Sequence, residues 1–167
     1  DQINNAAHDT WNADLGRIRV TGGTDQQKEV FYTALYHALI HPNVINDVNG
    51  EYPLMETFGD GKVPAGQDRY TVFSLWDTYR NVHQLMTLVY PERQIDMVRT
   101  MIDMSKEWGW LPKWELFGRE TFTMEGDPAI PVIVDTWRKG LKDFDMDAAY
   151  AAMKKSATTP GAQNPMR

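Results

Sequence analysis

The chain contains no cysteine, so it can form neither disulfides nor thiolate metal sites, although this absence does not determine its compartment. It has no apolar run long enough to cross a bilayer and no signal peptide at its start, so we expect no membrane insertion. Basic residues are few: 17 Lys and Arg stand against 23 Asp and Glu, which gives a formal net charge of −6. Without a basic stripe, nucleic acid is not an expected partner.

Aromatic residues, in contrast, are abundant, with six Trp and seven Tyr among 167 residues. Together with a hydrophobic content of 42%, they favour a packed or ligand-lined interior over disorder. A chain of this length can bury one core, so we expect a single domain or a piece of a larger one.

The segment 109–121 combines tryptophans, carboxylates and cations, and Pro112 and Gly118 keep it from forming a regular helix. This combination suits a sugar site, because a pyranose stacks its C–H face on indole while its hydroxyls bind charged groups. A carboxylic acid among aromatics can also have a raised pKa, as a general acid requires. The alternative is that the tryptophans pack a helix end into a core while the charges stay in water. The tryptophans concerned are Trp108, Trp110 and Trp114.

A second cluster, 73–80, predicts a helix start that presents Trp76, Asp77 and Arg80 together. Trp76 and Arg80 are four residues apart, and Asp77 and Arg80 are three apart, so each pair shares a helix face. These side chains could therefore approach one ligand from the same side. The alternative is an ion pair between Asp77 and Arg80 beside a tryptophan of the core.

Hydrophobic periodicity and capping residues predict an all-α chain of antiparallel helix hairpins. Thr24 and Gln27 form a capping box, Pro42 ends the helix that follows, and Pro91 separates two later helices. The polar loop 43–68 is too long for a simple connector, so we expect a binding loop. The expected helices are 5–15, 24–41, 70–90, 91–108, 130–140 and 145–158.

Five sequence blocks, in order and similarly spaced, closely resemble glycoside hydrolase family 92. The resemblance implies a calcium-dependent exo-α-mannosidase that inverts at the anomeric carbon. It also implies a catalytic domain that is an α/α toroid of the six-hairpin type, preceded by a β-sandwich domain. This chain resembles only the first part of the toroid. The blocks are 31–37, 47–52, 73–80, 109–121 and 126–129. The expected organisation is an entry helix and linker at 1–23, a partial toroid at 24–158, and a linker toward a missing C-terminal part at 159–167.

Inverting glycosidases use one carboxylic acid to protonate the leaving oxygen and one carboxylate, about 6.5–9.5 Å away, to activate water. The resemblance implies that the general acid is Glu120, in a Trp-Glu-Leu-x-Gly-x-Glu-Thr motif, with Glu115 as second choice. Glu120 follows Gly118, where a loop can aim the side chain into a cavity, whereas Glu115 directly follows Trp114. The alternative for Glu120 is a solvated ion pair with Arg119.

The resemblance further implies that Trp76, Asp77 and Arg80 bind the terminal mannose, Trp76 through its ring face and the charged pair through hydroxyls. Trp114 would stack on substrate or simply pack. The implied partners are mannose-terminated glycans with α-1,2 linkages, together with the β-sandwich and remaining toroid of the same protein. Secretion is common in the family, which favours a periplasmic or extracellular location.

No metal site is expected within the chain, although the resemblance implies Ca²⁺ as cofactor. His37 and His41 have the i, i+4 spacing of zinc ligands, but no third ligand accompanies them. The oxygen-rich run 46–51 lacks the spacing of an EF-hand calcium loop. Most calcium ligands are therefore expected outside this chain.

The paired aspartates thought to act as base in the family have no counterpart before Arg167. We therefore expect a mannosidase fragment that holds the acid and part of the mannose pocket and is inactive alone. Two rival interpretations remain. One is another toroid hydrolase, of glucoamylase or trehalase type, without a calcium requirement. The other is a non-catalytic helical module that binds glycans or a protein through its Trp-rich loops.

Overall fold

The computed structural model describes residues 1–160, and the chain divides into two compact units. The first unit is Asp1–His41 and the second begins at Pro42. Most of the predicted linker, residues 161–167, lies outside the described residues. Within residues 1–160, no helix is long and apolar enough to cross a membrane.

The first unit is a pair of helices, α1 (Gln2–Leu15) and α2 (Asp25–Ala38). The predicted capping box is confirmed at the start of α2. The Gln27 backbone N–H donates to Thr24 Oγ1 at 3.2 Å, and the Thr24 N–H donates to Gln27 Oε1 at 2.9 Å. These reciprocal bonds satisfy two backbone donors that would otherwise have no partner, so the sequence determines where α2 begins.

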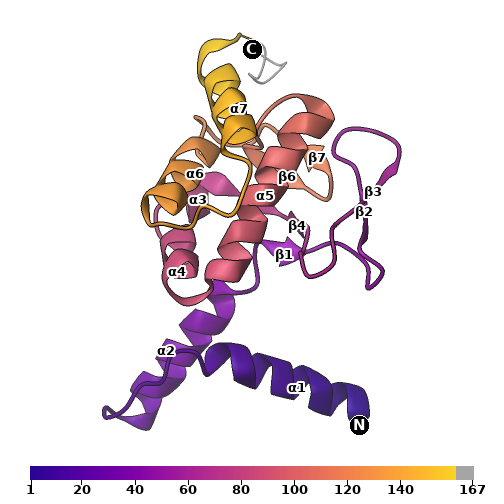
Figure 1. Cartoon of the computed structure of the whole chain (residues 1–167). Coiled ribbons are helices and arrows are strands. Elements are labelled where there is room, and N and C mark those ends of the chain that lie inside the picture. Colours follow the sequence, from indigo (N-terminus) through magenta and orange to yellow (C-terminus); the bar gives the residue numbers. More distant parts are fainter. Residues whose placement is uncertain (161–167) are drawn as a thin grey trace. The chain divides into compact units, whose positions relative to one another are not determined.

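Helix α5 (Pro91–Trp108) is the longest described helix, and the other helices of the second unit lie around it (Figure 1). Pro91 occupies its first turn as expected. Gly109 ends it in a left-handed conformation, with φ of 106°. The remaining helices of this unit are α3 (Leu75–Thr78), α4 (Val82–Val89), α6 (Ala129–Arg138) and α7 (Met146–Thr158).

Three small antiparallel sheets accompany the helices, so the predicted all-α toroid class is wrong. The structure is 51% helix and 11% strand, which makes it a mixed α/β protein. The sheets pair β1 (Asn43–Val44) with β4 (Tyr70–Thr71), β2 (Glu51–Pro53) with β3 (Asp60–Lys62), and β5 (Phe73–Ser74) with β6 (Trp114–Leu116) and β7 (Arg119–Glu120).

Within the predicted helices, the error lies in residues 70–90, which were predicted as one helix. Their first part forms β4 and β5, because a short apolar run suits a buried strand as well as a helix. Val72, between these strands, has φ of 60°, a left-handed value that a β-branched residue does not adopt inside a helix. The helical part is interrupted at Asn81, whose Oδ1 accepts the Val82 N–H at 2.8 Å.

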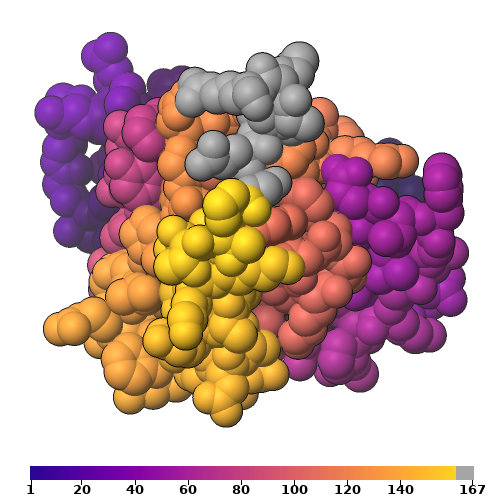
Figure 2. Space-filling model, turned by 90° about the horizontal axis from the view of Figure 1, so that it is seen from above, coloured from indigo at the N-terminus to yellow at the C-terminus, as the bar shows by residue number. Residues whose placement is uncertain are grey.

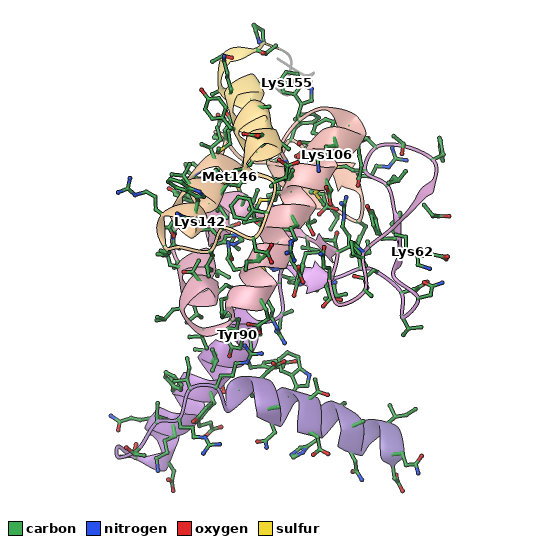
Figure 3. All side chains as sticks on the ribbon, viewed as in Figure 1. Lys62, Tyr90, Lys106, Lys142, Met146 and Lys155 are labelled. Carbon is green, nitrogen blue, oxygen red and sulfur yellow. The ribbon has the colours of Figure 1, made fainter. Side chains whose placement is uncertain are left out.

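The core of the second unit lies where α4, α5 and α6 pack together. Tyr90, at the junction of α4 and α5, is completely buried (Figure 3). Helix α7, yellow in Figure 2, contacts α5 and α6. Asp145 caps its start, because Asp145 Oδ1 accepts the Ala148 N–H at 2.9 Å.

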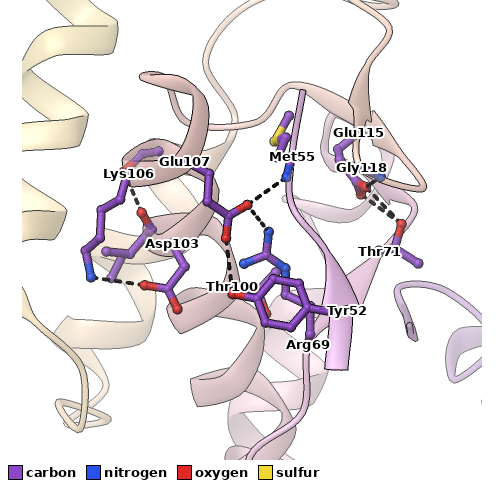
Figure 4. Close-up of polar contacts among 12 residues, drawn as sticks. Tyr52, Met55, Arg69, Thr71, Thr100, Asp103, Lys106, Glu107, Glu115 and Gly118 are labelled. Carbon is purple, nitrogen blue, oxygen red and sulfur yellow. Dashed lines mark hydrogen bonds and ion pairs between the residues drawn. The ribbon is translucent and has the colours of Figure 1, made fainter. Parts of the chain in front are cut away.

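A buried ion pair fastens the long loop 43–68 to α5 (Figure 4). Arg69 Nη2 lies 2.7 Å from Glu107 Oε2, and the two side chains are 3% and 11% exposed. The Glu107 carboxylate also accepts the Met55 N–H at 2.8 Å and the Tyr52 hydroxyl at 3.2 Å. The loop is therefore held in a defined conformation against α5, and its role in binding stays a prediction.

Candidate functional site

The third sheet brings the two sequence clusters around Trp76 and Trp114 together. Because β5 pairs with β6, Ser74 lies opposite Trp114 and Phe73 lies opposite Glu115. Strand β5 runs directly into α3, so this helix begins beside the β6–β7 hairpin. Two segments that are about forty residues apart in the chain therefore form one edge of the second unit.

Strands β6 and β7 are joined by a two-residue turn of Phe117 and Gly118, with φ of 49° and 81°. Left-handed conformations at both positions are typical of the tightest β-hairpins. Gly118 adopts this conformation without steric cost, whereas Phe117 needs outside support. That support comes from Thr71, whose Oγ1 accepts the Phe117 N–H at 2.9 Å, and from the Gly118 carbonyl, which accepts the Glu56 N–H at 2.8 Å.

Glu115, the second choice for the general acid, lies beneath this hairpin with no exposed surface. Its carboxylate accepts the Thr71 hydroxyl at 2.9 Å and the Gly118 N–H at 2.6 Å (Figure 4). Burial raises the pKa of Glu115 above its ordinary value, and these hydrogen bonds oppose the rise in part. In this conformation a substrate cannot touch Glu115, and its contacts fix the hairpin turn.

Glu120, the predicted general acid, is 8% exposed, and backbone donors occupy both of its oxygens. Oε2 accepts the Lys113 N–H at 2.7 Å, and Oε1 accepts the N–H groups of Trp114 and Phe122, both at 2.9 Å. These donors flank the hairpin on its two sides. The carboxylate therefore ties together the chain that enters β6 and the chain that leaves β7.

A third glutamate, Glu56 of the long loop, was not among the predicted site residues. Its Oε1 accepts the Glu120 N–H at 2.6 Å, and its Oε2 lies 3.3 Å from Arg119 Nη1. Arg119 therefore pairs with Glu56, and the alternative of a solvated pair between Arg119 and Glu120 is not what the structure shows. We call Glu56, Glu115 and Glu120 the glutamate clamp of the β6–β7 hairpin.

The predicted sugar-binding residues Trp76, Asp77 and Arg80 lie at α3, where Trp76 is 38% exposed. The Arg80 guanidinium lies 5.5 Å from the centre of the Trp76 ring and 5.2 Å from that of Tyr79, and donates to the Trp76 carbonyl at 2.8 Å. The carboxylate of Asp77 accepts a hydrogen bond from the Ser74 hydroxyl. Trp76 and Arg80 thus share a face as predicted, whereas Asp77 binds the residue that precedes the helix.

A further sequence block, 126–129, reaches the same edge through Lys113. Lys113 Nζ lies 2.9 Å from Asp127 Oδ1 and donates to the Gly126 carbonyl at 2.8 Å. A Cβ added at Gly126 would lie 3.9 Å from Trp76 Cζ3, so the glycine backbone runs close to the edge of the indole. Trp114, half-buried, lies on β6 opposite Ser74.

This edge can therefore bind a flat apolar ring face beside hydrogen-bonding groups. The indole of Trp76 supplies a stacking surface, and the carboxylate of Asp77 and the hydroxyl of Ser74 lie at the same helix start. Other apolar side chains from the neighbouring hairpin and loop are also exposed, namely Leu116, Phe117 and Met124. Such an arrangement is suited to the C–H face and hydroxyls of a sugar.

The described residues do not fit the implied calcium ion. Among residues 1–160, no group of three or more His, Asp or Glu side chains could hold a metal ion. In the oxygen-rich run 46–51, Asn46 Oδ1 accepts the Arg69 N–H at 2.6 Å, and Asn49 Oδ1 accepts the Glu51 N–H at 3.0 Å. These oxygens accept backbone hydrogen bonds that shape the long loop. That the calcium ligands lie outside the chain stays a prediction.

Sequence reasoning missed three residues that support the site: Glu56, Thr71 and His83. His83 is 1% exposed and bonds to Thr78 at the end of α3. One signal could have indicated it, because His83 occupies the apolar side of its helix, three residues before the buried Met86. No sequence pattern distinguishes Glu56 or Thr71, since both act on segments that are distant in the chain.

Comparison with known proteins decides the family. The catalytic domain of glycosyl hydrolase family 92 matches residues 1–167. The chain belongs to glycoside hydrolase family 92. No curated protein matches it.

Solved structures of this family resemble the chain closely. The family 92 α-mannosidase BT3965 from Bacteroides thetaiotaomicron has a TM-score of 0.84 and 36% identity, over 91% of this chain and 20% of that one. The same protein in complex with mannoimidazole matches with 37% identity. The inverting mannosidase BT2199 from Bacteroides thetaiotaomicron VPI-5482 has a TM-score of 0.87 and 32% identity, over 96% of this chain and 22% of that one. The chain therefore spans about a fifth of the length of these relatives.

Proposed function

We propose that this chain is part of the catalytic domain of an exo-α-mannosidase that releases mannose from glycans. The observation that carries the proposal is the family match over all of residues 1–167. Two further observations support it: 36% identity to a solved α-mannosidase, and a solved complex of that protein with mannoimidazole. A non-catalytic binding module has no comparable support.

The exposed side of α3 is the proposed place of the terminal mannose. Trp76 offers its ring face, and the Arg80 guanidinium on that ring restricts the orientation of the indole. Asp77 can accept hydrogen bonds from sugar hydroxyls with the lone pairs that Ser74 leaves free. Trp114 is proposed as a second apolar surface on the neighbouring strand β6.

Glu120 stays the predicted acid, but to donate a proton its carboxylate would have to exchange a backbone N–H partner for the leaving oxygen. Its contacts support a structural role in the glutamate clamp. The two roles differ in outcome, because a lost acid slows the hydrolysis of poor leaving groups, whereas a lost clamp destabilises the hairpin.

An inverting reaction, calcium dependence and a preference for α-1,2 linkages are proposed from the family resemblance. The general base, the calcium ligands and most of the leaving-sugar site are proposed to lie outside residues 1–160, as is a β-sandwich. On this proposal the 167 residues alone are inactive. A periplasmic or extracellular location is proposed on the same basis.

The test measures mannose release from α-1,2-linked mannobiose, with calcium and with a chelator. It compares the 167-residue chain with the protein extended to the length of its solved relatives. We expect activity only in the extended protein, loss of this activity with chelator, and β-mannose as the first product in the NMR spectrum. Activity of the 167 residues alone would overturn the proposal that their active site is incomplete. Inactivity of the extended protein toward every α-mannoside would overturn the proposed mannosidase function.

A further inference from the structure

A chain of buried hydrogen bonds crosses the second unit from α6 to α3. Its side chains are Thr136, Gln94, His83 and Thr78, with exposed fractions of 0%, 0%, 1% and 8%. Gln94 Nε2 donates to Thr136 Oγ1 at 2.9 Å, Gln94 Oε1 lies 3.0 Å from His83 Nδ1, and His83 Nε2 lies 3.0 Å from Thr78 Oγ1. One residue comes from each of α3, α4, α5 and α6, so the chain links four helices.

The proton positions in this chain follow from its far end. The Thr136 hydroxyl donates to the Val132 carbonyl at 2.7 Å, so its oxygen accepts from the amide of Gln94. The carbonyl oxygen of Gln94 must then accept from His83, which places the imidazole proton on Nδ1. His83 Nε2 is left as an acceptor for the Thr78 hydroxyl. Burial lowers the pKa of His83 to about 4, so the imidazole is neutral near pH 7, and each bond of the chain then has one direction.

The end of this chain lies directly beneath the proposed mannose site. Helix α3 has only four residues, too few to be stable without tertiary contacts. Leu75 and Thr78 are its buried residues, whereas Trp76 and Asp77 between them are exposed. Leu75 holds α3 on the core through apolar contacts, which are not directional. The hydrogen bond of Thr78 to His83 is directional and can fix it.

We propose that His83 is a positioning residue, which acts through Thr78 to fix the rotation of α3 and thereby aims Trp76 and Asp77 at the terminal sugar. This inference rests on the proposed function of α3. His83 itself touches no substrate, because it is buried behind Thr78. The glutamate clamp fixes the neighbouring hairpin in a similar way, so both sides of the site would be oriented by buried polar groups.

The test compares two isosteric substitutions in the complete gene product that contains residues 1–167. Thr78→Val removes the hydrogen bond at the α3 end, and Thr100→Val removes a comparably buried bond outside this chain, in which Thr100 Oγ1 accepts the Tyr70 N–H at 3.2 Å. We expect Thr78→Val to raise KM for α-1,2-linked mannobiose about tenfold, with kcat changed less than about twofold, because binding is lost equally in ground and transition states. Thr78→Ser, which keeps the hydroxyl, should restore KM, and Thr100→Val should leave it unchanged. Equal KM changes in the two valine variants would overturn the proposal.

A second readout does not depend on activity. The protein is labelled with 5-fluorotryptophan, and the Trp76 signal in the fluorine NMR spectrum is assigned with Trp76→Phe. We expect Thr78→Val to shift or split this signal, and Thr100→Val to leave it in place. An unchanged Trp76 signal in Thr78→Val overturns the positioning role. If the wild-type protein releases no mannose but the signal shifts as expected, only the proposed function fails.

Discussion

Replacement of Glu120 by glutamine separates the two roles open to this residue. Glutamine has nearly the shape of glutamate, but only one of its two terminal atoms accepts hydrogen bonds. Its oxygen can stay with the N–H groups of Trp114 and Phe122, and its NH₂ group then faces the N–H of Lys113. One hydrogen bond is lost, and two charge-assisted bonds become neutral.

The magnitude follows from these three contacts. An unpartnered, largely buried N–H costs about 1–3 kcal/mol. Each of the two remaining bonds weakens by about 0.5–1 kcal/mol when the acceptor loses its charge. The expected loss is therefore about 3 kcal/mol in the free energy of unfolding, or roughly 6–12 °C in Tm for a domain of this size.

The assay records thermal unfolding of the 167-residue chain. In the extended protein it records the hydrolysis of two mannosides, one with a good leaving group and one with a poor one. A clamp predicts the loss of stability and a similar loss of activity on both substrates. The control is Glu56→Gln, which keeps an acceptor for the Glu120 N–H and should cost less than Glu120→Gln. An unchanged Tm with activity lost only on the poor leaving group would refute the clamp and identify Glu120 as the general acid.

Three further predictions follow from the buried groups and the exposed tryptophan. Arg69→Met should lower the free energy of unfolding by about 3–5 kcal/mol, measured by denaturant titration, because it leaves the buried Glu107 carboxylate without its cation; adding Glu107→Gln, which removes the charge but keeps an acceptor for the Met55 N–H, should recover part of the loss. Burial lowers the pKa of His83 to about 4, so as pH drops the unfolded chain takes up a proton at this residue before the folded chain does. The free energy of unfolding should therefore fall by about 3 kcal/mol between about pH 6.5 and about pH 4. His83→Gln should remove this fall. Glu115 acts in the opposite direction: burial raises its pKa, so the stability that it contributes at low pH is lost as pH rises through its folded pKa. In the extended protein, Trp76→Ala should raise KM about tenfold with little change in Tm, since the side chain is 38% exposed. An unchanged KM would exclude stacking on the substrate.

The helices could largely be predicted because their signals are local. The capping box at Thr24, the proline at Pro91, the glycine at Gly109 and the cap at Asp145 each act within one turn of the chain. The strands could not be predicted, because each has only two or three residues and its partner lies far away in the chain. Phe73, for example, pairs with Glu115, and no local pattern in either segment specifies this register.

The site shows the same division. The sequence by itself determined the residue types and the family, since aromatic and acidic blocks in a set order are properties of the chain alone. Only the tertiary structure decided which side chains are available: it exposes Trp76, buries Glu115 completely, and surrounds Glu120 with backbone donors. It also brought in Glu56, Thr71 and His83 from distant segments. The physical reason is that helix ends depend on neighbouring residues, whereas burial and hydrogen bonding of a side chain depend on which distant segments pack against it.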